Sequence, residues 1–160
     1  IIRKEEPFSE WQIRNIHQLI LKNIDDDNAG RYRQQNVLIS GATTTPPDYT
    51  LLNDKMAQLV DWYNSESHKL HPIERAAKVH ADFVGIHPFI DGNGRTSRLL
   101  MNLELLKAGY PPCVITVENR LAYYEALDQW MAYGKTEAFI QLVSDAVLQG
   151  FKPYQVVLGI

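Results

Sequence analysis

A proline and two glycines near the middle of the chain constrain its fold most strongly. Residues 72–86 and 96–108 both carry apolar side chains at helical spacing. Between them, Pro88 disfavours helical backbone in the residue before it. Gly92 and Gly94 allow backbone conformations that other residues avoid. We therefore predict two helices joined by a short loop.

Helical periodicity recurs through most of the 160 residues. A first helix should begin after Ser9, a plausible N-cap, and fail near residues 25–30. Further helices are expected near residues 51–64, 118–131 and 136–149. The one β-rich run, residues 37–41, is followed by Pro46-Pro47 and predicts a small hairpin or an extended flap. The predicted fold is all-α: a helical bundle with a β-hairpin flap, forming a single domain over residues 1–160.

Composition excludes several functional classes. A formal charge of −3 and a pI near 5.9 argue against binding of bulk nucleic acid. Cys113 is the only cysteine, so no internal disulfide can form, and no apolar run is long enough to span a bilayer. The chain starts at Ile1 without a signal-peptide pattern, so we expect an excised part of a longer protein and a cytoplasmic location.

The loop and the start of the next helix, residues 87–98 (HPFIDGNGRTSR), contain residue types that handle phosphates. Gly92, Asn93 and Gly94 stand before a helix N-terminus, whose free N–H groups can form an anion-binding nest. Alone, they would favour an ordinary helix–loop–helix turn over a nest. Arg95 and Arg98 lie one turn apart where the helix dipole disfavours cations, which implies an anion between them.

Two further side chains of this loop suit catalysis. Asp91 can hold Mg²⁺ together with substrate oxygens, although a helix cap or a salt bridge to Arg95 explains it equally well. His87 is the natural general base because its ordinary pKa is near neutral. Phe89 should anchor the loop in the core. The remaining histidines are interpreted as structural, packing or surface residues: His17, His68, His71 and His80.

Taken together, these residues resemble the signature of the Fic family, HPF-x-D/E-GNGR-xx-R, at every specified position. The likeness extends to residues 30–33 (GRYR), 59–64 (LVDWYN) and 98–112 (RLLMNLELLKAGYPP). It is greatest for the subgroup that includes the animal endoplasmic-reticulum Fic enzyme, and we expect a bacterial member.

The resemblance implies transfer of AMP from ATP to a Ser, Thr or Tyr hydroxyl of a target protein. His87 would be the base and Asp91 would hold Mg²⁺. The implied phosphate-binding residues are Gly92, Asn93, Gly94, Arg95, Thr96, Ser97 and Arg98. Tyr123 and Tyr124 would line the adenine pocket. The implied flap, which binds an extended target segment by β-augmentation, comprises Val37, Leu38, Ile39, Ser40, Gly41 and Ala42.

One feature of many Fic proteins is missing from the sequence. No segment matches the inhibitory pattern S/T-xxx-E-G/N, so we expect inhibition from an upstream helix or from a separate antitoxin-like protein, and possible self-modification. The missing glutamate also disfavours the reverse activity, removal of AMP from a modified protein. The two arginines favour a triphosphate over other phosphate-containing donors. Intact His87 and Asp91 disfavour a regulatory module that binds nucleotide without turnover.

Overall fold

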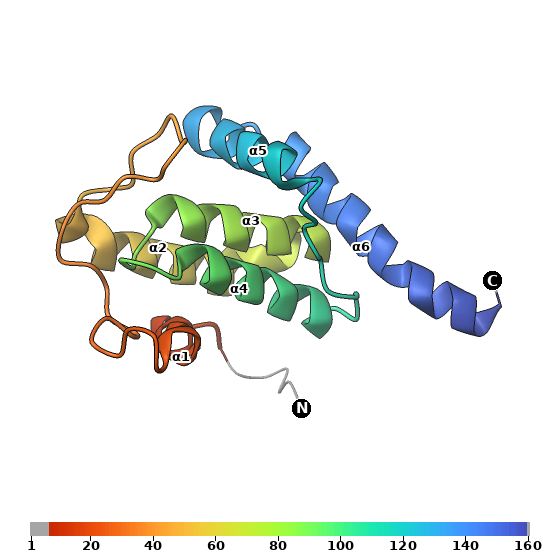
Figure 1. The fold of residues 1–160 in the computed structure, drawn as a ribbon, viewed down its shortest axis with the longest axis horizontal. Helices are drawn as coiled ribbons and strands as arrows, with labels where there is room; N and C mark the ends of the chain where they lie inside the picture. The colour runs from red at the N-terminus through yellow and green to blue at the C-terminus, as the bar shows by residue number, and fades with distance from the viewer. Residues whose placement is uncertain (1–6, 160) are drawn as a thin grey trace.

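Helix α3 (Pro72–Ile86) lies at the centre of the computed structural model, which describes residues 7–159. Side chains on nearly all sides of this helix are buried, which is typical of a core helix: Ala76, Ala77, Val79, His80, Ala81, Phe83 and Val84. Helix α4 (Asn93–Lys107) runs back along it after a short loop, as Figure 1 shows. The central helix–loop–helix prediction is therefore confirmed.

The other elements surround this pair. They are α1 (Glu10–Leu21), α2 (Leu52–Glu66), α5 (Arg120–Tyr133), α6 (Glu137–Leu158) and the 3₁₀ segments η1 (Tyr49–Leu51) and η2 (Ser67–Lys69). Between residues 7 and 159 the structure contains no β-strand. No helix in that range has the length and apolar character needed to cross a membrane.

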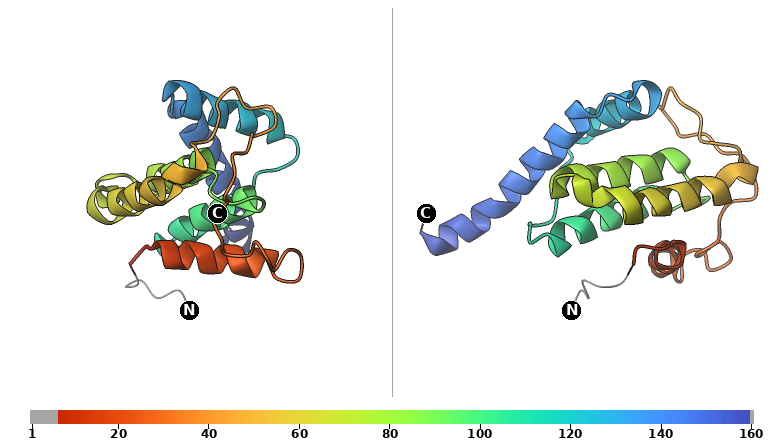
Figure 2. Two further views of the ribbon diagram at one scale, coloured as in Figure 1. Left: turned by 90° about the vertical axis from the view of Figure 1, so that its left-hand side faces the viewer. Right: turned by 180° about the vertical axis from the view of Figure 1, so that it is seen from behind.

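The buried side chains form two clusters on opposite sides of α3. One joins α3 and α4 to α5 and α6, with Phe139 and Leu127 among its large residues. The other joins α3 and α4 to α1 and α2, and it includes Phe83 and Phe89. Figure 2 shows α5 on one side of the central pair and α1 on the opposite side, with α2 beside α3. The loop between α3 and α4 is thus anchored in the second cluster.

Most helix boundaries follow their local signals. The Ser9 hydroxyl caps α1 by accepting from the Gln12 N–H at 3.3 Å, as predicted. Helix α4 begins at Asn93 rather than at Thr96, because Gly92 in a left-handed conformation serves as its N-cap. Helix α6 continues past the predicted end at residue 149. Gly150 lets it pack closely on Pro111, where an added Cβ would meet ring carbons at 3.1 Å.

The segment from residue 34 to 48, here called the flap, differs from prediction. Its chain is extended, but neither arm forms a strand, which corrects the predicted β-hairpin. Pro46 and Pro47 have no N–H, so the second arm cannot supply the donors that a ladder needs. The Asn36 side chain joins the arms instead, donating to Asp48 at 2.8 Å and accepting from the Tyr49 N–H at 2.9 Å. In Figure 1 the flap spans from the side of α1 to the end of α5.

Candidate active site

His87 ends α3 in a left-handed backbone conformation, with φ 51° and ψ 57°. For a residue other than glycine this costs roughly 1–2 kcal/mol, so surrounding contacts must hold it. The His87 N–H donates to the Phe83 carbonyl at 3.0 Å. In the side chain, Nδ1 lies 3.2 Å from the Val84 carbonyl. A carbonyl only accepts, so Nδ1 carries the proton and Nε2 is the basic nitrogen.

The surroundings of His87 keep its ring neutral. Burial lowers its pKa from the ordinary value of 6.5, and the nearby Arg33 guanidinium lowers it further. The Val84 carbonyl acts in the opposite direction but does not outweigh them. Because its pKa is lowered, the imidazole is neutral at physiological pH. A neutral imidazole can accept a proton, which is what a general base requires.

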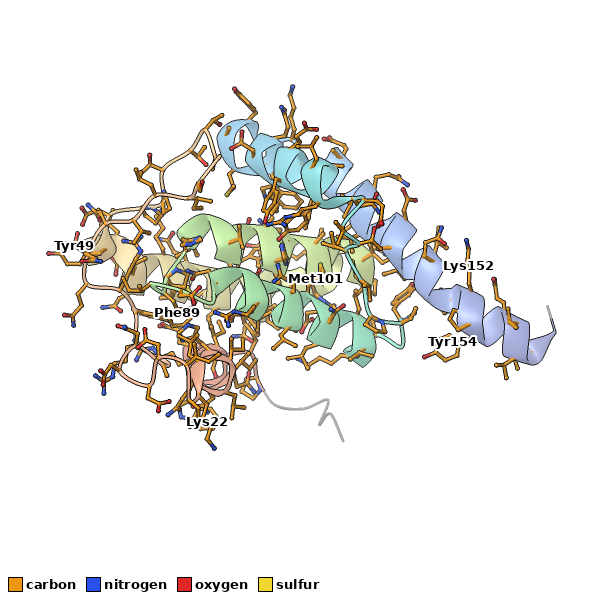
Figure 3. The ribbon with its side chains drawn as sticks, in the orientation of Figure 1. Lys22, Tyr49, Phe89, Met101, Lys152 and Tyr154 are labelled. Atoms are coloured by element: carbon orange, nitrogen blue, oxygen red, sulfur yellow. The ribbon has the colours of Figure 1, made fainter. Side chains whose placement is uncertain are left out.

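The loop after His87 is closed by one side chain. Asn93 accepts from the Phe89 N–H at 3.0 Å and donates to the Phe89 carbonyl at 2.8 Å. Phe89 itself is completely buried, as predicted, and packs near Phe83 and Tyr32. Figure 3 shows Phe89 where the α3–α4 loop meets α1. The Asn93 amide is therefore used for loop closure, which leaves its backbone N–H for ligand binding.

His17 is a site residue that the sequence analysis missed. Its Nδ1 accepts from the Gly30 N–H at 2.9 Å, so Nε2 carries the proton and donates to the Asp91 carbonyl at 2.9 Å. The ring stacks on Phe89, with centroids 3.5 Å apart and planes 1° apart. Burial lowers the pKa of His17 and favours this neutral form. Helical spacing from Ile13 signals that residue 17 is buried, but not which groups it contacts.

The N-terminus of α4 offers a nest for an anion. The first intrahelical donor is Thr96, whose N–H reaches the Gly92 carbonyl at 2.9 Å. The preceding N–H groups, of Asn93, Gly94 and Arg95, belong to the first turn and have no intrahelical acceptor. Thr96 and Ser97 face inward and are fully buried, and the Ser97 hydroxyl donates to the Gly94 carbonyl at 3.0 Å. This geometry does not support phosphate contacts through these two hydroxyls.

The charged side chains of the loop are accessible. Arg95 forms an ion pair with the Asp91 carboxylate at 2.7 Å, with side chains 41% and 65% exposed. Such an exposed pair is worth about 0–1 kcal/mol, so a ligand can replace it at little cost. Arg98 is exposed, and its guanidinium lies 3.4 Å from where a Cβ of Gly94 would be. Both arginines are thus close to the nest.

Asp91 is a single carboxylate, which could hold a metal ion only together with water and substrate oxygens. Among residues 7–159 no three His, Cys, Asp or Glu side chains form a metal-binding cluster. One Asp91 oxygen accepts from the Gly92 N–H at 2.6 Å, while the carboxylate remains largely open to solvent. Mg²⁺ is commonly held by one carboxylate, waters and substrate phosphates, so this donor set suits it.

Tyr123 and Tyr124 lie side by side but in different environments. Tyr123 is buried, its hydroxyl is 2.9 Å from His80 Nε2, and burial raises its pKa to about 12. Tyr124 is 53% exposed. Both line a cavity of about 220 Å³ together with Arg98. This is below the roughly 300 Å³ typical of small-molecule pockets, so it can take only part of a nucleotide. The predicted structural role of His80 is confirmed by its complete burial.

Two contacts hold the flap, and neither was predicted. Arg33 is buried at its base and donates to backbone carbonyls of both flap arms. At the tip, the Thr43 N–H and hydroxyl both donate to the Asp128 carboxylate at 2.8 Å. Among the predicted target-binding residues, Leu38 is 80% exposed between half-buried Val37 and Ile39. Ser40 and Gly41 form a turn, which the Ala42 N–H closes by donating to the Ile39 carbonyl at 3.2 Å.

Comparison with known proteins adds independent information. The model of the Fic/DOC family matches residues 7–105, which include the flap and the loop. Protein adenylyltransferase fic-1 of Caenorhabditis briggsae is 44% identical over 126 residues, covering 78% of this chain and 24% of the relative. Protein adenylyltransferase Fic of Nematostella vectensis is 42% identical over 145 residues, covering 90% of this chain and 33% of the relative.

The fold also matches a solved structure of Fic-1 from C. elegans. The TM-score is 0.84 at 35% identity, and the match covers 95% of this chain and 44% of that one. The chain spans about a quarter of the length of the first curated relatives. These relatives are animal proteins, so they lend no support to the expected bacterial source.

Proposed function

The chain belongs to the Fic/DOC family, and from this premise we propose that it transfers AMP from ATP to a protein hydroxyl, releasing pyrophosphate. The observation that carries the proposal is the placement of a base and an anion nest in one loop. His87 Nε2 is the basic nitrogen of a neutral ring, and the free N–H groups of the α4 N-terminus follow six residues later. Relatives named protein adenylyltransferases support this assignment.

In the proposed reaction His87 Nε2 takes the proton of a target Ser, Thr or Tyr hydroxyl. The hydroxyl oxygen bonds to the α-phosphorus of ATP, and the bond from that phosphorus to the β-phosphate bridging oxygen breaks. Pyrophosphate leaves with the electron pair, and the imidazolium later returns its proton to solvent. The protein contributes position and charge, so no covalent protein intermediate is needed.

The nest, Arg95 and Arg98 neutralise the charge of the leaving pyrophosphate in this scheme. Asp91 would hold Mg²⁺, which shields the phosphate charges when bound. A phosphate bound to Arg95 and a Mg²⁺ ion held by Asp91 would replace the exposed ion pair of these two side chains, whose loss costs little. The cavity beside Tyr123 and Tyr124 would receive the part of the nucleotide next to Arg98.

The flap is the proposed docking site for the target protein. Residues 37–39, just before the turn at Ser40 and Gly41, have no strand partner in the described chain, and an extended target segment would supply one. The same mode allows another copy of this chain to be modified. Residues 1–160 contain no matching glutamate motif, so inhibition would come from a helix outside these residues or from a separate protein.

Labelled ATP tests this function directly. The purified chain with Mg²⁺ and a cell lysate should attach label from the α-phosphate and none from the γ-phosphate, and mass analysis should find added AMP. Replacement His87→Ala should lower transfer by about 10²–10⁴-fold while nucleotide binding survives. Label from the γ-phosphate would indicate phosphorylation instead. Nucleotide binding without any transfer would support a regulatory binding module.

A further inference from the structure

Arg33 is a buried charged residue that forms no salt bridge with a carboxylate among residues 7–159. Its side chain is 3% exposed. The guanidinium donates to three backbone carbonyls: those of His87 at 2.9 Å, Gln35 at 2.8 Å and Pro47 at 2.6 Å. The backbone N–H of Arg33 donates to the Pro88 carbonyl at 2.9 Å. One residue therefore contacts both arms of the flap and the first two residues of the catalytic loop.

The burial of this cation is costly, so its position needs an explanation. Burial lowers the pKa of Arg33, with only a partial offset from the charge of Asp48. An apolar side chain would fill the space more cheaply, but it would leave the carbonyls of His87, Gln35 and Pro47 without this donor. The two flap arms do not pair with each other as strands. The fixed fork of the guanidinium therefore joins them at their base, in addition to the Asn36 side chain.

We propose that Arg33 is a positioning residue that joins the target-binding flap to the base His87. Its Nε–H holds the His87 carbonyl, at the point where the backbone is in a strained left-handed conformation. The two other donors hold the flap arms. Movement of the flap and displacement of the His87 backbone are then coupled through one planar group.

The charge of Arg33 also affects the pKa of His87. Its guanidinium charge acts on the His87 ring and keeps the pKa of that ring lower than it would be without this charge. The Val84 carbonyl opposes this effect. Arg33 therefore helps to keep the base unprotonated, in addition to holding its backbone. The catalytic consequence rests on the proposed AMP transfer, whereas the flap linkage does not.

Two substitutions separate charge from geometry. Arg33→Lys keeps the charge but cannot bond three carbonyls in one plane, and Arg33→Gln removes the charge as well. The matched control is Arg31→Gln, which removes an exposed arginine from the same segment. Self-labelling with α-labelled ATP and Mg²⁺ is measured from pH 5 to 9, on protein whose folded fraction is known from circular dichroism.

Both Arg33 variants should label roughly 10- to 100-fold more slowly per folded molecule, because a small misplacement of a base costs this much. In Arg33→Gln the acid limb of the pH–rate profile should also move to higher pH, since the pKa of His87 rises. In Arg33→Lys that limb should stay in place, and Arg31→Gln should match the unmutated protein. Rates that follow only the folded fraction, with an unmoved acid limb in Arg33→Gln, would overturn the positioning role.

Limited proteolysis tests the flap linkage without relying on activity. Thermolysin, which cleaves before apolar residues, should cut at exposed Leu38 several-fold faster in Arg33→Lys than in Arg31→Gln, with other sites unchanged. Equal cleavage at Leu38 would overturn the linkage.

If neither Arg33 variant folds, hydrogen exchange in the ¹⁵N-labelled unmutated protein tests the proposal. Its Arg33 Nε–H should exchange slowly with water, and fast exchange counts against the proposal. Unmutated protein that never self-labels contradicts the proposed function alone.

Discussion

His17 should be as important for the structure of the α3–α4 loop as the residues of the loop itself. The variant His17→Phe keeps an aromatic ring on Phe89 but removes both hydrogen bonds of the imidazole. The Gly30 N–H and the Asp91 carbonyl each lose their partner. A buried backbone group left unpaired costs about 1–3 kcal/mol, and both bonds here are partly buried, so we expect a loss of about 2–4 kcal/mol.

Urea unfolding followed by circular dichroism measures this loss. The control is His68→Phe, at an exposed histidine, where the free energy of unfolding should change by less than about 0.5 kcal/mol. His17→Ala also removes the stack on Phe89 and leaves a cavity, so it should be less stable than His17→Phe by a further 2–4 kcal/mol, roughly. The phenylalanine variant is the informative one because it can remain folded.

The same variant has a predicted effect on function. Without the bond to its carbonyl, Asp91 should be less well placed, and the Mg²⁺ concentration for half-maximal self-labelling should rise several-fold in the folded protein. The His68→Phe control should keep the unmutated value. The free energy of unfolding of His17→Phe could instead lie within about 0.5 kcal/mol of that of the unmutated protein, with an unchanged Mg²⁺ requirement. In that case the two bonds have no role in loop placement.

Three further perturbations have defined outcomes. Glu104→Ala removes a buried carboxylate that pairs with Arg75 at 3.2 Å, so it should cost about 3–5 kcal/mol in urea unfolding while the KM for ATP of the folded fraction stays unchanged. Burial lowers the pKa of His80 from 6.5 to about 4, so the unfolded chain binds its proton first and stability should fall by about 3 kcal/mol from pH 6.5 to 4; a flat urea-midpoint series would contradict this. Gly92→Ala forces a Cβ to 3.0 Å from His17 Nε2 at φ 79°, so it should lose at least about 1–2 kcal/mol in thermal unfolding, and an unchanged Tm would refute the steric argument.

The helices were predictable because their signals are local. Apolar spacing and the breaker residues around Pro88 lie within one turn of the boundaries that they set, and α3 ends at Ile86 as expected. The start of α4 was missed because Gly92 acts as an N-cap only in its left-handed conformation. The hairpin was predicted wrongly for a different reason: a strand needs a partner, and the sequence of one β-rich run does not reveal whether a partner exists.

The candidate site was predictable as a set of residue types but not as a geometry. His87, Asp91 and the α4 N-terminus occupy one loop, so their proximity follows from sequence alone. The groups that hold the loop come from elsewhere. His17 is 74 residues from the carbonyl that it binds, and Arg33 is 54 residues from His87. Contacts between residues so far apart in the chain leave no pattern in a single sequence.

These distant contacts explain why the strained base can be stable. The left-handed backbone of His87 and the αL conformation of Gly92 lie at the two ends of a short loop that has little regular hydrogen bonding of its own. Arg33 binds the carbonyl at the first end and His17 binds next to the second, while Phe89 fills the core between them. Arg33 also binds the flap, and His17 belongs to α1. The geometry of the proposed base His87 therefore depends on the flap and on α1, so movement of either element should change the proposed AMP transfer.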